Sequence, residues 1–151
     1  MNDSIAELIF QPPVVLTPTD VAALTALERF NQRLFVGRGL NLQSTADQAL
    51  TKVFVGTAYS ITAAIAVAKT GGATVVCVGG IYTAASKGGN ALIGAAQSWI
   101  GLSAANKRVS ATLAGIVDTD IQTAATLYFS LTTGSTAAAT CDLFVLGLIL
   151  D

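Results

Sequence analysis

Beyond residue 40, apolar residues come in short runs in which every second position is apolar. The clearest runs are Arg108–Leu113 and Thr126–Thr132, where the alternation starts from Val109 and from Leu127. This period of two, with β-branched and aromatic residues, is typical of strands that bury one face. Residues that favour turns separate the runs: Gly71-Gly72, Gly88-Gly89-Asn90, Ala105-Asn106-Lys107 and Gly134-Ser135. Many short strands at this spacing predict an all-β sandwich or barrel.

Two runs do not alternate and are apolar on both faces. They are Thr74–Val78 and Leu143–Leu150. A strand with one face in water should alternate, so the second face of each run must also be covered. The cover would be a neighbouring subunit or the N-terminal part of the chain. On the last run, the pattern gives Phe144, Leu146 and Leu148 as a candidate interface between subunits.

The segment Ser60–Lys69 is compatible with two structures. It has an N-cap residue, good helix formers and a following Gly71-Gly72 stop, which favour a helix. It also alternates large residues with small ones. Because the segments on both sides have the pattern of strands, we expect a strand.

The first forty residues differ from the rest and contain all three prolines of the chain. Residues 5–16 are apolar, and the Pro12-Pro13 pair within them fixes an extended path that no central strand tolerates. Such a segment is either an arm that docks on another protein or an arm that folds back on its own domain. The candidate docking residues are Leu8, Ile9, Phe10, Val14, Val15 and Leu16.

A helix is predicted over residues 18–33. Thr17 is a suitable N-cap, Pro18 suits the first helical position, and Asp20 complements the helix dipole. Apolar residues recur near helical spacing at Val21, Leu24, Leu27 and Leu34. Because Gly37 and Gly39 would end this region, we divide the chain into an arm with a short helix (1–40) and a β domain (41–151).

The chain carries few charges. Charged residues make up 11% of its 151 residues, against about 25% in typical globular proteins, and hydrophobic residues make up 52%. This scarcity favours a surface that other chains largely cover, as in obligate oligomers. The alternative is a monomer whose surface consists of neutral Thr, Ser, Ala and Gly residues. The net charge of −1 provides no basic field for nucleic acid, and no run is long and apolar enough for a membrane helix. Neither nucleic acid nor a membrane is therefore an expected partner.

Candidate chemistry is sparse. The chain has no histidine, which excludes Ser–His–Asp triads and His-containing zinc sites. The pair Asp118 and Asp120 could flank a cation or do acid–base work, but loop aspartates more often accept backbone hydrogen bonds. We expect no enzyme activity, no cofactor and no metal.

Trp99, the only tryptophan, would stack on a sugar ring if exposed or anchor a core if packed, and its apolar neighbours favour packing. Cys77 and Cys141 each lie in an apolar run. They are expected to be buried free thiols rather than a disulfide, because the first residues show no secretion signal.

The segments IYTAASKGGNALIGAAQSW, RVSATL and TLYFSLTTGSTAAATCDLFVLG carry a family resemblance. They resemble the small jelly-roll structural proteins of tailed bacteriophages, in which a "YTAA-KGG-A" strand and turn precede a "LY-SLTT-G-AAT-D-FV-G" pair. The resemblance covers about residues 45–147 and lies in strands and turns. It implies an eight-stranded jelly-roll sandwich, preceded here by the arm and the short helix.

The same resemblance implies a function. Such proteins are capsid decoration (cement) proteins, head fibres or receptor-binding tips, and are typically homotrimers. We expect a decoration protein on the outer capsid surface of a virion, whose partners are two further copies of itself and the major capsid protein. The alternatives are a fibre or tail tip that binds a receptor or glycan, and another minor virion structural protein. A glycan-binding tip would need exposed aromatic residues among Trp99, Tyr59, Tyr82 and Tyr128.

Overall fold

The computed structural model describes residues 32–72, 76–114 and 121–151. In these residues the chain forms eight strands and no helix, so the all-β prediction is confirmed. The strands are β1 (Gln32–Asn41), β2 (Gln48–Lys52), β3 (Tyr59–Gly71), β4 (Val78–Ala84), β5 (Gly88–Ile93), β6 (Arg108–Ser110), β7 (Leu127–Thr133) and β8 (Ala139–Ile149).

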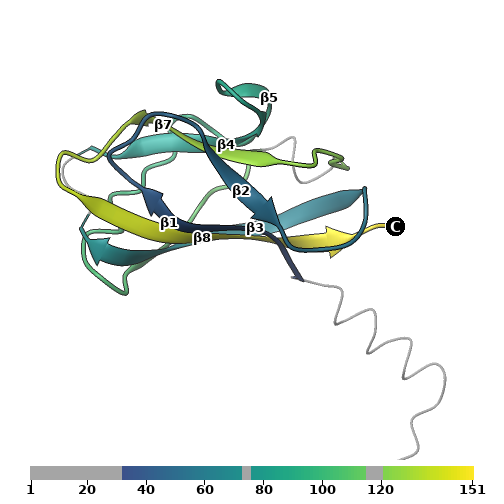
Figure 1. Ribbon diagram of the computed structural model, residues 1–151, viewed down its shortest axis with the longest axis horizontal. Coiled ribbons are helices and arrows are strands. Elements are labelled where there is room, and N and C mark those ends of the chain that lie inside the picture. Colours follow the sequence, from purple (N-terminus) through teal and green to yellow (C-terminus); the bar gives the residue numbers. More distant parts are fainter. Residues whose placement is uncertain (1–31, 73–75, 115–120) are drawn as a thin grey trace, which may run out of the picture.

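The strands form one curled antiparallel sheet in the order β5-β4-β7-β2-β1-β8-β3-β6. Strand β2 pairs with β7 on one side and with β1 on the other, so it carries the sheet from one layer into the next. Figure 1 shows this directly: β4 and β7 lie in the upper layer, β1, β8 and β3 lie in the lower one, and β2 runs between them. The curl brings the inner faces of the layers together around one core.

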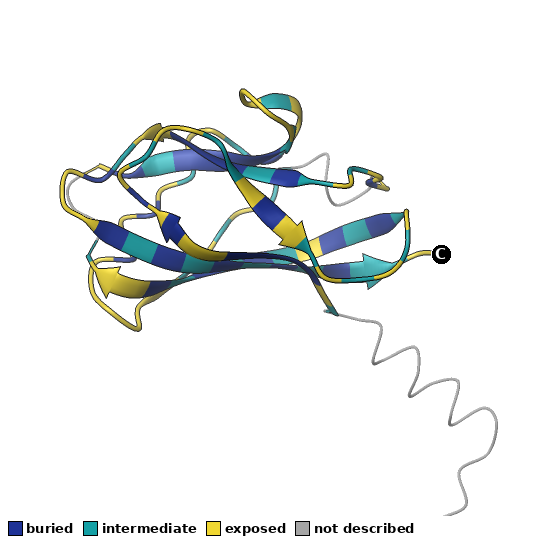
Figure 2. Cartoon of the chain, viewed as in Figure 1, coloured by how far each residue is buried: buried dark blue, intermediate teal, exposed yellow. Residues whose placement is uncertain are grey.

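Alternation of the side chains explains how the long strands fill that core. Along β8, buried and half-buried residues alternate from Ala139 to Leu148, and β3 does the same between Tyr59 and Ala68 apart from an irregularity at Thr62 (Figure 2). The predicted strand at Ser60–Lys69 is thereby confirmed. The strand predicted over Thr126–Thr132 is likewise confirmed, as β7.

Aromatic side chains pack against one another inside the core. Trp99 is fully buried, donates a hydrogen bond from its indole N–H to the Gly79 carbonyl at 3.1 Å, and packs edge-on against Phe129 with the ring centroids 5.3 Å apart. At the other end of the core, Phe35 and Tyr59 lie with ring centroids 5.3 Å apart. The packing prediction for Trp99 is confirmed.

The sequence-based boundary near residue 40 is wrong in one respect. Strand β1 begins at Gln32 and pairs with both β2 and β8, so residues 32–40 belong to the sheet rather than to the arm. The helix predicted over residues 18–33 is therefore wrong at residues 32 and 33, which belong to β1, and residues 18–31 lie outside the described residues. Irregular register between Arg33 and Phe35 places Leu34 and Phe35 both in the core, which hides the alternation expected of a strand.

The prediction of a strand over the apolar run Thr74–Val78 is also wrong for its described residues before Val78. Its described residues Val76 and Cys77 precede the strand, and Val76 is 47% exposed. Strand β4 begins at Val78 and continues through Gly79-Gly80, with an irregular register at that point as expected of a bulge. A Cβ on Gly79 would lie 2.4 Å from the Leu131 Cα, so glycine is what allows β4 to approach β7 this closely.

Candidate interaction surface

The outward side of the lower layer carries a surface of mostly half-buried apolar residues. Phe144 of β8 pairs with Ile65 of β3 and with Val36 of β1, and Leu146 pairs with Ala63. Paired residues in an antiparallel sheet share a face, and the inner neighbours of these residues are in the core. We name this surface the outer face; its apolar residues are Val36, Ala63, Ile65, Val67, Phe144, Leu146 and Leu148.

Charged residues border the outer face. Arg33 lies opposite Leu146, Arg108 lies opposite Val67, and Arg38 and Lys69 flank Asp142. These four cations are half of the eight in the whole chain. The outer face is therefore an apolar surface with a predominantly basic border.

Asp142 links the charged residues of this border. Its carboxylate accepts hydrogen bonds from Arg38 at 2.9 Å and from the Gly39 N–H at 2.8 Å, and Lys69 lies 3.9 Å away. Burial opposes ionisation of this carboxyl, but the hydrogen bonds and the two cations outweigh it and hold its pKa below the usual value. The guanidinium of Arg38 also lies over the ring of Phe144, 5.2 Å from its centroid.

A hollow of about 260 Å³ opens on the outer face at its β3 side. Its apolar lining comes from Val67, Ala68 and Phe144, and its polar edge comes from Lys69, Asn106 and Asp142. A hollow with an apolar floor and charged edges suits an apolar side chain that is presented by a polar or acidic segment.

The structure thus brings together the three residues predicted as a subunit interface, since Phe144, Leu146 and Leu148 share the half-buried side of β8. Sequence reasoning missed Ile65 and Val67 of β3, which lie on the same face. Their alternation with small residues was visible, but only the register between β3 and β8 shows that both strands contribute to one surface. The predicted docking residues Leu8 to Leu16 lie outside the described residues.

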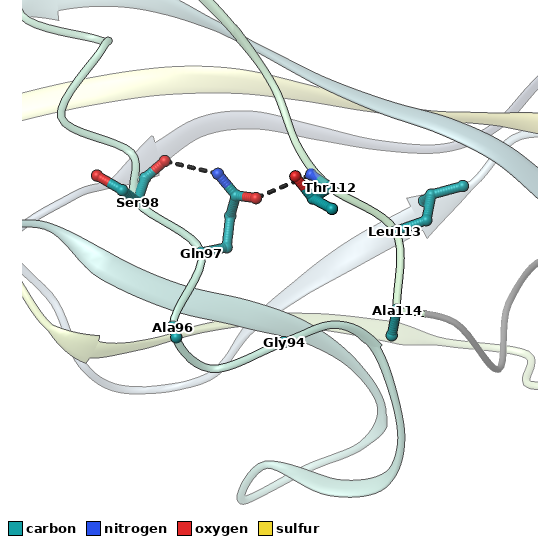
Figure 3. A pocket seen from close by; sticks show the side chains of 7 residues that line it. All are labelled: Gly94, Ala96, Gln97, Ser98, Thr112, Leu113 and Ala114. Carbon is teal, nitrogen blue, oxygen red and sulfur yellow. Dashed lines mark hydrogen bonds between the residues drawn. The ribbon is translucent and has the colours of Figure 1, made fainter.

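A second pocket, of about 480 Å³, lies between the segments that follow β5 and β6. It is lined by Gly94, Ala96, Gln97, Ser98, Thr112, Leu113 and Ala114 (Figure 3). The Gln97 amide crosses it, accepting a hydrogen bond from the Thr112 N–H at 2.8 Å and donating one to the Ser98 carbonyl at 2.7 Å. The Gln97 amide thereby links the segment after β5 to the segment after β6.

Three of the four aromatic residues considered for glycan stacking are in the interior. Trp99, Tyr59 and Tyr82 are buried, and Tyr128 is half-buried. The burial of three rings weighs against a stacking platform.

Cys77 and Cys141 are buried and free, as expected. Burial raises the pKa of the Cys141 thiol to about 12 and raises that of Cys77 as well. The candidate carboxylates Asp118 and Asp120 lie outside the described residues. Among the residues that the structure describes, no three His, Cys, Asp or Glu side chains gather as a metal-binding group.

No helix in the described part of the chain has the length and apolar character needed to cross a membrane. No family model, curated protein or solved structure matches this chain. The arguments about function therefore rest on the outer face and on the sequence.

Proposed function

We propose that this chain is a structural, non-enzymatic jelly-roll protein that self-associates through its outer face and decorates a bacteriophage capsid. The observation that carries the proposal is the apolar surface on β3 and β8, centred on Phe144 and Leu146. The residues of this surface are half-buried, and burial of their remaining apolar area would favour binding.

The strand order supports the jelly-roll part of the proposal. The curled sheet divides at β2 into two sets of four strands, β1-β8-β3-β6 and β2-β7-β4-β5. In a jelly roll, two sheets with this interleaved order pack face to face. The core between the two layers, with Trp99 against Phe129, is consistent with that arrangement.

The assembly that we propose is a homotrimer. An interface in which one part of a subunit contacts a different part of the next forms a ring when the rotation between neighbours closes, and a rotation of 120° closes with three copies. The outer face, with Phe144, Leu146 and Leu148, supplies one side of this interface. The scarcity of charged residues, 11% of the chain, is consistent with a surface that is partly covered by other copies.

The arm gives the assembly its attachment to the capsid. Three arms in one trimer bind a shell with avidity, so each contact can be weak when measured alone. We assign residues 8–16 to this contact with the major capsid protein. The place of the protein would then be the outer surface of the virion.

The test is co-sedimentation of the full chain with shells that lack it, assembled from the major capsid protein of the same genome. We expect the wild-type chain to sediment with the shells and the Leu8→Ser/Phe10→Ser variant to remain in solution as an intact trimer. Leu16→Val, which keeps an apolar side chain, is the matched control and should bind. Binding of the double variant at the wild-type level would overturn the assignment of the arm.

A further inference from the structure

We propose that the loop between β2 and β3, residues 53–58, docks on the outer face of a second copy of this chain and places Val55 in the hollow there. The contact rests on the proposed self-association, and it supplies the second surface of that interface. Three observations carry it: the exposure of Val55, the charges beside Val55 and beside the hollow, and the distance between the loop and the hollow within one chain.

Val55 is the most exposed large apolar residue in the part of the chain that the structure describes. It is 95% exposed, and Val53 in the same loop is 50% exposed. The hollow offers the complementary shape, because Val67 and Phe144 give it an apolar lining. Burial of an aliphatic side chain in such a hollow favours association.

Hydrogen bonds hold the loop in place around Val55. The Lys52 ammonium donates to the Gly56 carbonyl, and the Asp151 carboxylate accepts from the Thr57 N–H at 2.7 Å and from the Ala58 N–H at 3.2 Å. A loop that is already fixed loses little conformational entropy when it docks. Val55 is therefore presented as a preformed apolar contact.

Charge favours this loop over a second outer face as the occupant. Asp151 lines the same recess as Val55 and forms no salt bridge with any described residue. At the hollow, Lys69 stands at the edge and Arg108 lies opposite Val67. Two outer faces against each other would bring their basic borders together, whereas the loop brings a carboxylate toward these cations.

Distance excludes the chain's own hollow as the place where Val55 docks. Val67 in the hollow lies eight residues along β3 from Tyr59, where the loop ends. Eight strand residues span about 26 Å at roughly 3.3 Å per residue. Figure 1 shows the same separation: the loop lies at the end of the lower layer where β8 finishes, and β8 starts at the opposite end. The contact therefore joins two different surfaces of two copies, as a ring requires.

The experiment is photo-crosslinking of the full-length chain with p-benzoylphenylalanine in place of Val55. We expect an adduct of doubled mass whose second peptide contains residues 65–69 or 142–146. The same probe in place of Ile121, which is 63% exposed in another loop, is the control and should not label these residues. Adducts within one chain, adducts to other parts of a second copy, or no adduct from an oligomeric chain would overturn the docking of Val55 in the hollow.

A double-mutant cycle provides an independent test. Val55→Ala and Val67→Ala should each raise the dissociation constant of the assembly roughly fivefold. Because the two side chains meet across the interface, the double variant should raise it by clearly less than the product, roughly 25-fold. Ile121→Ala, the control, should show no such coupling to Val67→Ala.

Full additivity of Val55→Ala and Val67→Ala would contradict their contact. A wild-type chain that sediments as a monomer would instead contradict the proposed function itself, so the two failures are distinguishable.

Discussion

Phe144 of β8 and Ile65 of β3 lie directly opposite each other on the outward side of the sheet. The residues that follow them along each strand, Val145 and Ala66, point inward and are buried. Both strands therefore have one apolar face in the core and another apolar face outside it. The outer apolar face is only half-buried within the described residues, and this partial exposure is what self-association would remove.

A substitution at Gly79 should separate β4 from β7. In Gly79→Ala the new Cβ would lie 2.4 Å from the Leu131 Cα and 2.5 Å from the Ser130 carbonyl oxygen, and backbone atoms cannot move aside cheaply. Overpacking of this kind costs about 1–3 kcal/mol. We expect a lower urea midpoint than wild type. The control is Gly94→Ala, whose Cβ has no neighbour within 4 Å, and an equal midpoint for both variants would refute the close approach.

Asp47 should contribute to stability in a way that depends on pH. Its carboxylate accepts hydrogen bonds from the Ser130 hydroxyl and from the Ser86 N–H, the latter at 2.5 Å, and so ties the β4–β5 turn to β7. These bonds lower the pKa of Asp47. A lowered pKa means that the stabilisation is present above the unfolded-state pKa and is lost as the pH falls through the folded-state value.

The variant Asp47→Asn isolates that contribution. We expect the free energy of unfolding of the wild type to fall more between pH 7 and pH 3 than that of the variant, measured by urea titration at each pH. Asp142→Asn, at another carboxyl whose pKa is lowered, provides a comparison within the same sheet. An identical loss in the wild type and in Asp47→Asn would show that the carboxylate bonds do not favour the folded state.

The predictability of the fold differed between strands for physical reasons. The sequence LYFSLTT alternates strictly, so β7 could be placed with almost correct bounds. Strand β1 could not, because the irregular register beside Phe35 breaks the period of two and Val21 to Leu34 follow a helical spacing.

Only the β8 part of the outer face could be predicted from the sequence. The second face of β8 was visible as a continuous apolar run, which gave Phe144, Leu146 and Leu148. The contributions of β3 and of Arg33, Arg38 and Lys69 depend on which strands become neighbours. That pairing is a long-range property, since Val67 meets Asp142 across 75 positions of the sequence, and no local pattern encodes it.

The two thiols should be protected in the folded protein. Burial raises the pKa of Cys141 to about 12, and both side chains are in the core, so little reactive thiolate is available at pH 8. We expect a disulfide reagent to label the native chain slowly and the urea-unfolded chain rapidly at both positions. Rapid labelling of the native chain would contradict the packing of Cys77 and Cys141.

Trp99 reports on the core without any substitution, because it is the only tryptophan. Its burial and its bond to the Gly79 carbonyl predict an emission that is blue-shifted from that of the unfolded chain and is not quenched by iodide. The variant Trp99→Ala should lose about 3–5 kcal/mol of stability. Strong iodide quenching in the native state would instead place the ring at the surface, where it could stack on a glycan.

The most direct test of the central claim is the native mass of the full-length chain, measured by sedimentation or native mass spectrometry beside the variant Leu146→Lys. The account predicts three times 15.3 kDa for the wild type. It predicts a folded monomer for the variant, because a charge would then stand in the middle of the outer face. A wild-type chain that is monomeric at micromolar concentration would contradict self-association through Phe144 and Leu146.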